Sequence, residues 1–327
     1  MTTAATHQHL STSAFMVPDK ILVASDLTDI EYLLPHAISQ CKACAASLVL
    51  SHVIPPVESE SLEQAMFLIA DIARREEQKA LNQARSLLGG AAAQVRAAGI
   101  DCEVVIRRGH PRYEIAELVG QVHAGRVILG THGRRNLEKF FHGSTAHEIL
   151  KSTSVPVWTV GPHARPFAHG QPSRILHPVS LSSGYQETAK FAVGLGQFYK
   201  AEITLLHVLP RDVHAEYASE RLVRWTAFEL MRLIPDEAPL WTTATVMVGA
   251  GEIVEQILHA AEKLGADLIV MGSNPDTAFW PVYGDNTVYN VIAEAKCPVL
   301  TLRHSVNSRG LSNLGPPARD NKSPQIL

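Results

Sequence analysis

The chain has 327 residues, of which 46% are hydrophobic and 19% are charged, and its formal net charge is −3. This length favours two domains, and the composition is typical of a folded protein with buried cores rather than of a disordered chain. No basic block stands out, which argues against nucleic acid as the main partner, and no run of about 18 apolar residues occurs, so no membrane span is expected.

The N-terminal residues 1–19 are small and polar and are expected to form a disordered tail. They lack the charged and apolar regions of a secretory signal. The chain contains only four cysteines, which suits a reducing compartment better than a disulfide framework. A cytoplasmic protein is therefore expected.

From residue 20 to residue 161, buried strands alternate with helical patterns. Strands are predicted at 20–26, 47–54, 101–107, 127–130 and 155–160. The helix after the first strand can be capped by Thr28 or Asp29, and helical periodicity covers residues 61–98, where Gly89-Gly90 could break it. Pro111 suits the first turn of a further helix. Such alternation, with strands apolar on both faces, predicts a parallel sheet covered by helices on both sides.

The stretch VILGTHGRRNLEKFFHGST, residues 127–145, reads as a strand, a flexible loop and a helix start. Glycines let the backbone turn tightly and approach a ligand, and the unpaired N–H groups of a helix start favour anions. The stretch therefore predicts a phosphate cradle formed by Gly130, Gly133, Gly143, Ser144 and Thr145. His132 lies inside the loop, and two roles stay open for it: donating to a phosphate oxygen, or facing the solvent.

The same pattern occurs a second time after residues 162–173, which are rich in proline and are interpreted as a linker. The strand sequences RILHPV, AEITLLHV, DLIVMG and KCPVLTL at 174–302 echo those of the first copy. Residues 174–303 are therefore predicted to be a second domain of the same kind, and residues 304–327 a disordered tail.

The spacing G-x-x-G-x9-G-S after an apolar strand resembles the universal stress protein family. Asp26 at the end of the first strand and His52-Val53 in the second match that family as well. The resemblance implies two tandem doubly wound, Rossmann-like domains of the adenine nucleotide alpha hydrolase-like type. Each would have a five-stranded parallel sheet in the order 3-2-1-4-5 with flanking helices. In such a sheet the ligand crevice opens where the strand order reverses.

The family likeness also implies the ligand, which is an adenine nucleotide: ATP, alone or with Mg²⁺. Asp26 would accept hydrogen bonds from ribose hydroxyls or help to hold a metal, and the backbone of Val53 would meet the adenine edge. The phosphates would lie against Gly130, His132, Gly133, Gly143, Ser144 and Thr145. In the second copy Ser180 replaces Asp26, Pro275 replaces a glycine and Asp285 follows Gly284, so that copy is expected to be degenerate and the chain to bind one ATP.

Three functions are compatible with these motifs. The first is a stress protein in which ATP is a regulatory ligand of domain 1 while domain 2 is a structural or partner-binding copy, its protein partner being unknown. The second is an enzyme that slowly hydrolyses ATP or transfers its phosphate. The third is an interaction protein that does not depend on nucleotide. No general base, catalytic triad or metal cluster is readable, so no catalytic residue is assigned.

Two further groups are interpreted as structural. Cys41-x-x-Cys44 falls late in the first helix, where two core residues are favoured over a redox or metal pair. His52 and His207 occupy matching positions of buried strands, which favours packing over metal binding.

The fifth strand of each copy would lie at a sheet edge, whose open backbone groups must be paired or covered. VPVWTV and CPVLTL are similar in length and apolar, so they are predicted to associate across a pseudo-two-fold axis and form an internal dimer. Further pairing of chains into a homodimer through other faces stays open.

Overall fold

The computed structural model describes residues 17–56, 66–131, 145–181, 185–209, 216–236, 238, 242–273 and 285–303. Strands and helices alternate throughout. Domain 1 contains β1 (Lys20–Ala24), α2 (Ile30–Cys44), β2 (Ser47–Ile54), α3 (Met66–Ala97), β3 (Cys102–Arg108), α4 (Pro111–Val122), β4 (Arg126–Gly130), α6 (Thr145–Ser152) and β5 (Val157–Val160). Domain 2 contains β6 (Arg174–Pro178), α7 (Tyr185–Tyr199), β7 (Glu202–Leu209), α8 (Glu216–Met231), β8 (Ala244–Ala250), α9 (Ile253–Leu264), β9 (Leu268–Ser273), α10 (Asp285–Glu294) and β10 (Val299–Arg303).

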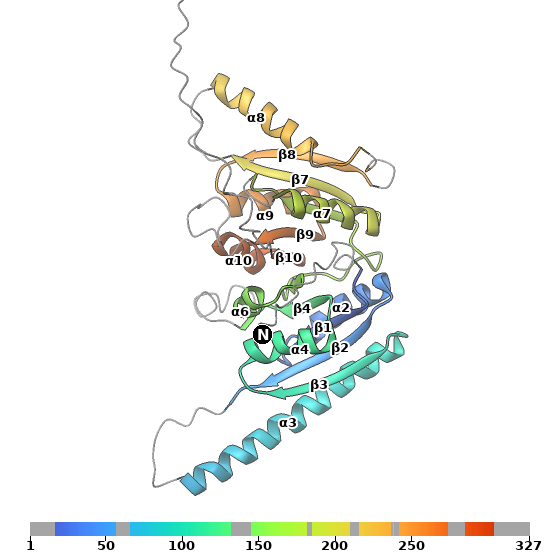
Figure 1. Ribbon diagram of the computed structural model, residues 1–327, viewed down its shortest axis with the longest axis vertical. Helices are drawn as coiled ribbons and strands as arrows, with labels where there is room; N and C mark the ends of the chain where they lie inside the picture. The colour runs from blue at the N-terminus through green and yellow to red at the C-terminus, as the bar shows by residue number, and fades with distance from the viewer. Residues whose placement is uncertain are drawn as a thin grey trace, which may run out of the picture.

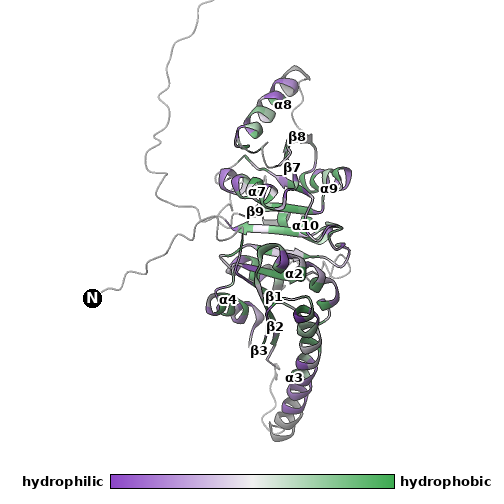
Figure 2. Cartoon of the chain, turned by 90° about the vertical axis from the view of Figure 1, so that its right-hand side faces the viewer, coloured by the Kyte–Doolittle hydropathy of each residue, from purple (hydrophilic) through white to green (hydrophobic). Residues whose placement is uncertain are grey.

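These strands form one sheet in the order β3-β2-β1-β4-β5-β10-β9-β6-β7-β8. Within each domain the neighbouring strands are parallel. The two domains follow one another along the long axis of the molecule, with helices on both faces of the sheet (Figure 1). In Figure 2, β9 is hydrophobic, whereas α7 and α9 carry hydrophilic residues on their outer sides. The predicted fold class, α/β with a mostly parallel sheet and flanking helices, is confirmed.

The two domains meet where β5 pairs with β10. The ladder is antiparallel and joins Val157 to Thr301, Trp158 to Leu300 and Thr159 to Val299. The Thr159 hydroxyl also donates to the Val299 carbonyl at 2.9 Å. Two edges that would otherwise expose unpaired N–H and C=O groups are thereby joined. The predicted pairing of the two fifth strands is confirmed, although β5 begins at Val157 instead of residue 155.

Helix α3 is one continuous helix, so the break considered at Gly89-Gly90 is wrong. Glycine inside a helix costs about 1 kcal/mol relative to alanine. That cost is offset by packing, because Ala84, Leu88 and Val95 on the same helix are fully buried in the core. Tertiary packing routinely outweighs helix propensity in this way.

A buried polar cluster crosses the junction between the domains. The Arg126 side chain at the start of β4 is fully buried and donates to Oε1 of Gln40 on α2. Its Nη1 lies 3.4 Å from the hydroxyl of Tyr199 on α7, and its guanidinium lies 5.6 Å from the centre of the Trp158 ring. The Tyr199 hydroxyl donates to Gln40 Oε1 at 2.7 Å. Tyr199 belongs to domain 2 and the other three residues to domain 1, so the cluster ties the domains together.

Residues 162–173, which the sequence predicts to be a linker, pack closely on domain 1. Phe167 is nearly buried and meets the rings of His36 and Trp158 edge to face, with centroids 5.1 and 6.1 Å apart. The Ser39 hydroxyl donates to the Gly170 carbonyl at 2.5 Å. His36 is itself fully buried, and this burial lowers its pKa to about 4. The segment therefore contributes to the core in addition to connecting the domains.

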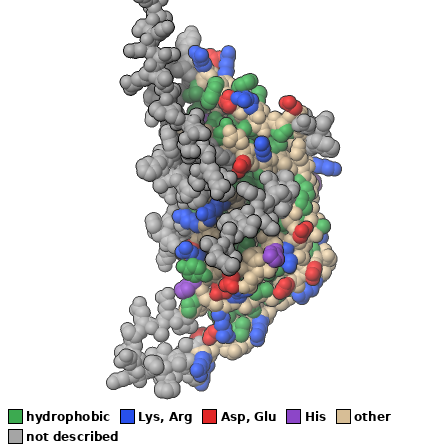
Figure 3. All heavy atoms as spheres, viewed as in Figure 1, with side chains coloured by type: hydrophobic (Ala, Val, Ile, Leu, Met, Phe, Trp, Pro, Cys, Tyr) green, Lys and Arg blue, Asp and Glu red, His purple; other side chains and the backbone are tan. Residues whose placement is uncertain are grey.

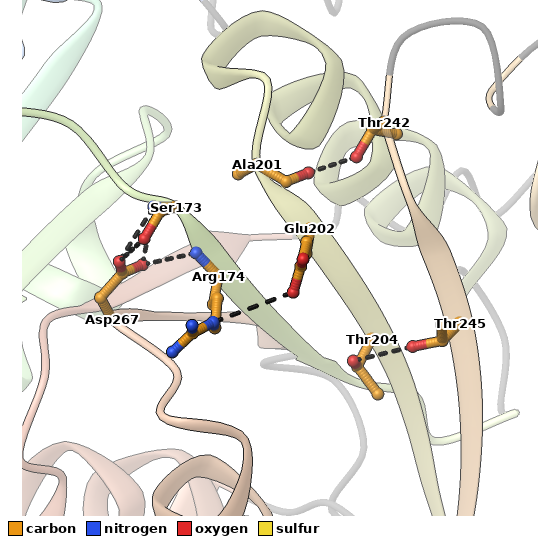
Figure 4. A network of polar contacts seen from close by, with 8 residues as sticks. All are labelled: Ser173, Arg174, Ala201, Glu202, Thr204, Thr242, Thr245 and Asp267. Carbon is orange, nitrogen blue, oxygen red and sulfur yellow. Dashed lines mark hydrogen bonds and ion pairs between the residues drawn. The ribbon is translucent and has the colours of Figure 1, made fainter. Parts of the chain in front are cut away.

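At the amino ends of the domain 2 strands, polar side chains secure the backbone (Figure 4). The Asp267 carboxylate accepts from the backbone N–H groups of Ser173 and Arg174 and, at 2.7 Å, from the Ser173 hydroxyl. Arg174 also pairs with Glu202 at 3.8 Å. These contacts lie at the amino ends of β6, β7 and β9, so they stabilise the starts of these strands.

Candidate functional site: the crevice between β1 and β4

The crevice is placed by the pairing of β1 with β4. These parallel strands are adjacent, with Ala24 opposite Leu129, and β2 lies on the other side of β1. The chain order reverses between β1 and β4, and ligands of doubly wound sheets bind at the carboxyl ends of strands at such a point. Asp26 and Gly130 stand at these two strand ends, so the structure brings the predicted site residues of β1 and β4 to one edge.

A tight turn follows β1. The Asp26 carboxylate is exposed and accepts from the backbone N–H of Thr28 at 2.8 Å and from its hydroxyl at 2.7 Å. Aspartate commonly closes turns by bonding the backbone two residues on. Leu27, between them, has a φ of 79°, a left-handed conformation that side chains other than those of Gly, Asn and Asp rarely adopt. Strain of this kind is concentrated at functional sites.

Asp29 is the residue that the sequence did not assign to the site. It occupies the N-cap position of α2, but its side chain makes no capping hydrogen bond, so the expected cap is wrong. Instead it is buried, and its carboxylate accepts from the Ser25 hydroxyl at 2.5 Å. A Cβ atom on Gly130 would lie 2.7 Å from Asp29 Cγ, a distance that real atoms do not reach. Position 130 must therefore be glycine because the Asp29 carboxylate lies against its backbone.

Tyr32 joins α2 to the end of β4. Its hydroxyl donates to the Thr131 carbonyl at 3.0 Å. Burial, and then the nearby carboxylates of Asp29 and Asp26, raise the pKa of Tyr32 above its usual range. The hydroxyl therefore stays protonated and remains a donor, which holds the first turns of α2 against the strand that leads into the glycine loop.

Val53 and His52 lie near the end of β2. Val53 is buried in β2, and its strand borders β1 on the side away from β4. Nδ1 of His52 is 2.9 Å from the Ser25 carbonyl. In domain 2, Nδ1 of His207 is 2.7 Å from the Val179 carbonyl, at the matching place. Both histidines thus tie the second strand to the end of the first, as a structural role requires.

Most of the predicted phosphate loop lies outside the described residues: His132, Gly133, Gly143 and Ser144 are among residues 132–144. Thr145 is the first residue of α6. Helix α6 is linked to α4 by an ion pair between Glu148 and Arg112 at 3.6 Å. The structure therefore describes the beginning of the strand–loop–helix stretch and the helix at its end.

In domain 2 the corresponding turn follows β6. Ser180 stands where domain 1 has Asp26, and Leu181 has a positive φ of 53°, as Leu27 has in domain 1. The backbone turn is therefore repeated without the carboxylate. Pro275 and Gly284 lie outside the described residues, and Asp285 is the first residue of α10.

The cysteines and the charged surface add no second site among the described residues. Cys41 and Cys44 are buried thiols, and burial raises the pKa of Cys41 to about 12, so the core interpretation holds. No group of three or more His, Cys, Asp or Glu residues in the described part of the chain could hold a metal ion. On the face in Figure 3, basic and acidic side chains are interspersed. Among the described helices, none has the length and apolar character to cross a membrane.

Comparisons with known proteins agree with this architecture. The model of the Universal stress protein family matches residues 18–161 and again residues 172–303. Universal stress protein MJ0531 of Methanocaldococcus jannaschii is 26% identical over 144 residues, which is 43% of this chain and 81% of that protein. Universal stress protein Sll1388 of Synechocystis sp. is 26% identical over 149 residues, covering 43% of this chain and 96% of that protein. The crystal structure of a universal stress protein from Archaeoglobus fulgidus superposes with a TM-score of 0.65 at 18% identity, covering 89% of this chain and 98% of that one.

Proposed function

Because the chain belongs to the universal stress protein family, with two copies of the family's domain in tandem, we propose that it binds ATP in domain 1 and that the nucleotide acts there as a regulatory ligand. Domain 2 serves as a structural or partner-binding copy.

One observation carries this proposal. The ends of β1 and β4 are neighbours at the reversal of strand order, and Asp26 and Gly130, which opens the predicted phosphate loop, follow or end these two adjacent strands. A loop of glycines leading into a helix start suits phosphate oxygens, because backbone N–H groups can approach without an intervening Cβ.

The described residues fit an adenine nucleotide laid across the strand ends. Val53 and Gly130 belong to β2 and β4, which flank β1, and strands of a sheet are spaced by about 4.8 Å. Their ends are therefore separated by roughly 10 Å. In this proposal the base lies at Val53, the ribose near Asp26 and the phosphates at Gly130. In this proposal His132, Gly133, Gly143, Ser144 and Thr145 complete the phosphate site.

Any Mg²⁺ would enter with the nucleotide. This cation prefers oxygen ligands and is commonly held by one or two carboxylates together with substrate phosphates. Asp26 is an exposed carboxylate at the crevice that could take such a role. When bound, the ion would neutralise phosphate charge.

Domain 2 is proposed not to bind ATP in this manner, since Ser180 and Pro275 replace the carboxylate and the second glycine of the loop. The binding surface for a protein partner, and any further pairing of chains into a homodimer, would then use faces other than the joined β5 and β10 edges. The cytoplasm is the proposed compartment.

The test is to identify and count the nucleotide. The full chain is purified, denatured and analysed by mass spectrometry for released nucleotide, and stripped protein is titrated with ATP by calorimetry. We expect adenine nucleotide and one site per chain. Two equivalent sites would contradict the degenerate role of domain 2, and no binding at millimolar ATP would refute the proposed function. Measuring released phosphate in the same samples distinguishes a regulatory ligand from a hydrolysed substrate.

A further inference from the structure

Helix α8 carries a stripe of large apolar side chains on its outer side. Trp225, Phe228 and Met231 are 55%, 59% and 58% exposed, and they follow one another at intervals of three residues, which places them on one side of a helix. Thr226 and Leu230 are fully buried and lie on the opposite side, where α8 packs on β8 and β7. The helix therefore covers the sheet with one face and presents the three apolar side chains, here called the α8 stripe, on the other.

The area of the α8 stripe suits an interface. A large side chain such as Phe or Trp has about 150–250 Å² to bury, so the exposed parts of the three members amount to roughly 350 Å². Contact between two such stripes would remove roughly 700 Å² of apolar surface from water, and interfaces are about 55–60% apolar. The corresponding total of roughly 1,200 Å² reaches the size of specific protein–protein interfaces.

The matching helix of domain 1 shows that the fold does not require such a stripe. Helix α3 follows the second strand of its domain and packs on the third, as α8 does. In the part of α3 whose side chains are described, the exposed positions from 74 to 86 are all polar, and Leu87 is the one large apolar residue that is exposed. The apolar outer side of α8 is therefore a feature of domain 2, and patches of this size often serve in binding.

The strand beside α8 has an edge without the usual protection. The sheet ends in β3 on one side and in β8 on the other. Edge strands are commonly protected from pairing by charged residues or proline. The sequence of β3 contains Glu103, Arg107 and Arg108, whereas β8, ATVMVGA, contains neither a charge nor a proline. The α8 stripe and this uncharged edge strand belong to the same end of the molecule (Figure 1).

The charge of α8 favours a second copy of the chain over a lipid surface. Residues 216–232 contain three Glu and three Arg, so their net charge is zero. Helices that lie on anionic membranes are rich in Lys and Arg on their polar side, and this balance gives no such attraction. Two neutral helices can approach each other without net repulsion. Aromatic residues and arginine together are also the composition typical of the residues that dominate protein–protein affinity.

We propose that the α8 stripe is the surface through which two copies of this chain form a two-fold dimer, with the two β8 strands beside the contact. In a two-fold dimer the same patch serves on both sides, and Phe228, the middle member of the stripe, lies nearest to the axis. The β5 and β10 edges, which are already joined within the chain, take no part. This inference goes beyond the proposed nucleotide site and does not depend on it.

The experiment measures the dimer dissociation constant of the full chain by sedimentation equilibrium without nucleotide. Wild type is expected to dimerise with a dissociation constant of about 10 µM or lower. Phe228→Asp should raise this constant at least tenfold, because it places a charge in the centre of the contact. Val223→Asp is the matched control, since Val223 is also exposed but lies roughly 140° around the same helix from Phe228. Leu87→Asp on α3 is the control at the other end of the molecule, and thermal midpoints check that each variant folds.

A wild type that stays monomeric at about 100 µM would refute the inference, also where it binds lipid vesicles or another protein, because the stripe then has a different occupant. An unchanged dissociation constant in folded Phe228→Asp, or an equal rise in Val223→Asp, would overturn it too. Should Phe228→Asp fold poorly, Phe228→Cys gives a second test, since the four native cysteines are buried. With oxidised glutathione, Phe228→Cys should form a disulfide-linked dimer and Leu87→Cys should not; the reverse result would place the contact at domain 1. Because no nucleotide is present, failure here leaves the proposed function untouched.

Discussion

Removing one hydroxyl oxygen from the junction between the domains should measurably lower the free energy of unfolding. In Tyr199→Phe the ring is kept, but the hydroxyl that donates to Gln40 Oε1 at 2.7 Å is lost. Tyr199 is almost completely buried, so water cannot take the place of this hydroxyl. Its burial also raises the pKa of the phenol, which keeps it a donor at neutral pH.

The magnitude follows from what remains. A buried acceptor left without a partner costs about 1–3 kcal/mol, whereas an ordinary hydrogen bond contributes about 0.5–1.5 kcal/mol. In Tyr199→Phe, Gln40 Oε1 still accepts from Arg126. The loss of stability should therefore lie where the two ranges overlap. We expect the free energy of unfolding to fall by about 1–1.5 kcal/mol.

Urea unfolding of wild type, Tyr199→Phe, Gln40→Leu and the double variant forms a double-mutant cycle. The coupling between the two positions should be about 1 kcal/mol, and Tyr113→Phe, at a residue 62% exposed, is the control that should change little. Additivity of the two substitutions within about 0.3 kcal/mol would refute the claim that this cluster links the domains. Several probes should be followed, because a chain of two domains need not unfold in one step.

Three further predictions concern the junction, pH and the nucleotide loop. Val157→Asp places a carboxylate at a residue that is 2% exposed within the β5–β10 ladder, so it should lower the free energy of unfolding by about 3 kcal/mol or more and separate the domains. An unchanged thermal midpoint and unchanged solution scattering would contradict this. Val223→Asp, on the surface of α8, is the control. The pKa of His36 is about 4 in the folded protein and 6.5 in the unfolded chain, so below pH 6.5 unfolding is accompanied by proton uptake. The contribution of His36 to the free energy of unfolding should therefore fall from about pH 6.5 towards pH 4, by roughly 3 kcal/mol at the lower limit, and stay level above pH 6.5. His36→Leu should lack this part of the pH dependence, and identical profiles for the two proteins would show that His36 is not responsible. Gly143→Val should leave the fold intact and reduce ATP affinity at least tenfold, about 1.4 kcal/mol; a folded variant that binds ATP as wild type does would mean that the phosphates lie elsewhere.

The local sequence pattern determined the strands, the division into two domains and the place where the domains join. Apolar runs that end at Asp26 and Gly130, separated by helical periodicity, specify strands whose carboxyl ends meet at one edge of a parallel sheet. The repeat of these runs specified two domains, and the exposed backbone of an edge strand specified that the two fifth strands would pair. Each of these signals is local or periodic, so it can be read without coordinates.

Only the tertiary structure decided how polar residues are used. A sequence gives no means of telling that Arg126, at the start of a strand, is fully buried, because the residues that surround it come from α2, β5 and α7. In the sequence, Asp29 looks like an ordinary helix cap. Whether an aspartate caps a helix depends on the direction of its side chain, and here that side chain bonds Ser25 and lies against Gly130 instead of capping α2. Phe167 in the supposed linker and the unbroken α3 have the same explanation: burial against partners distant in sequence outweighs the local preference of the chain.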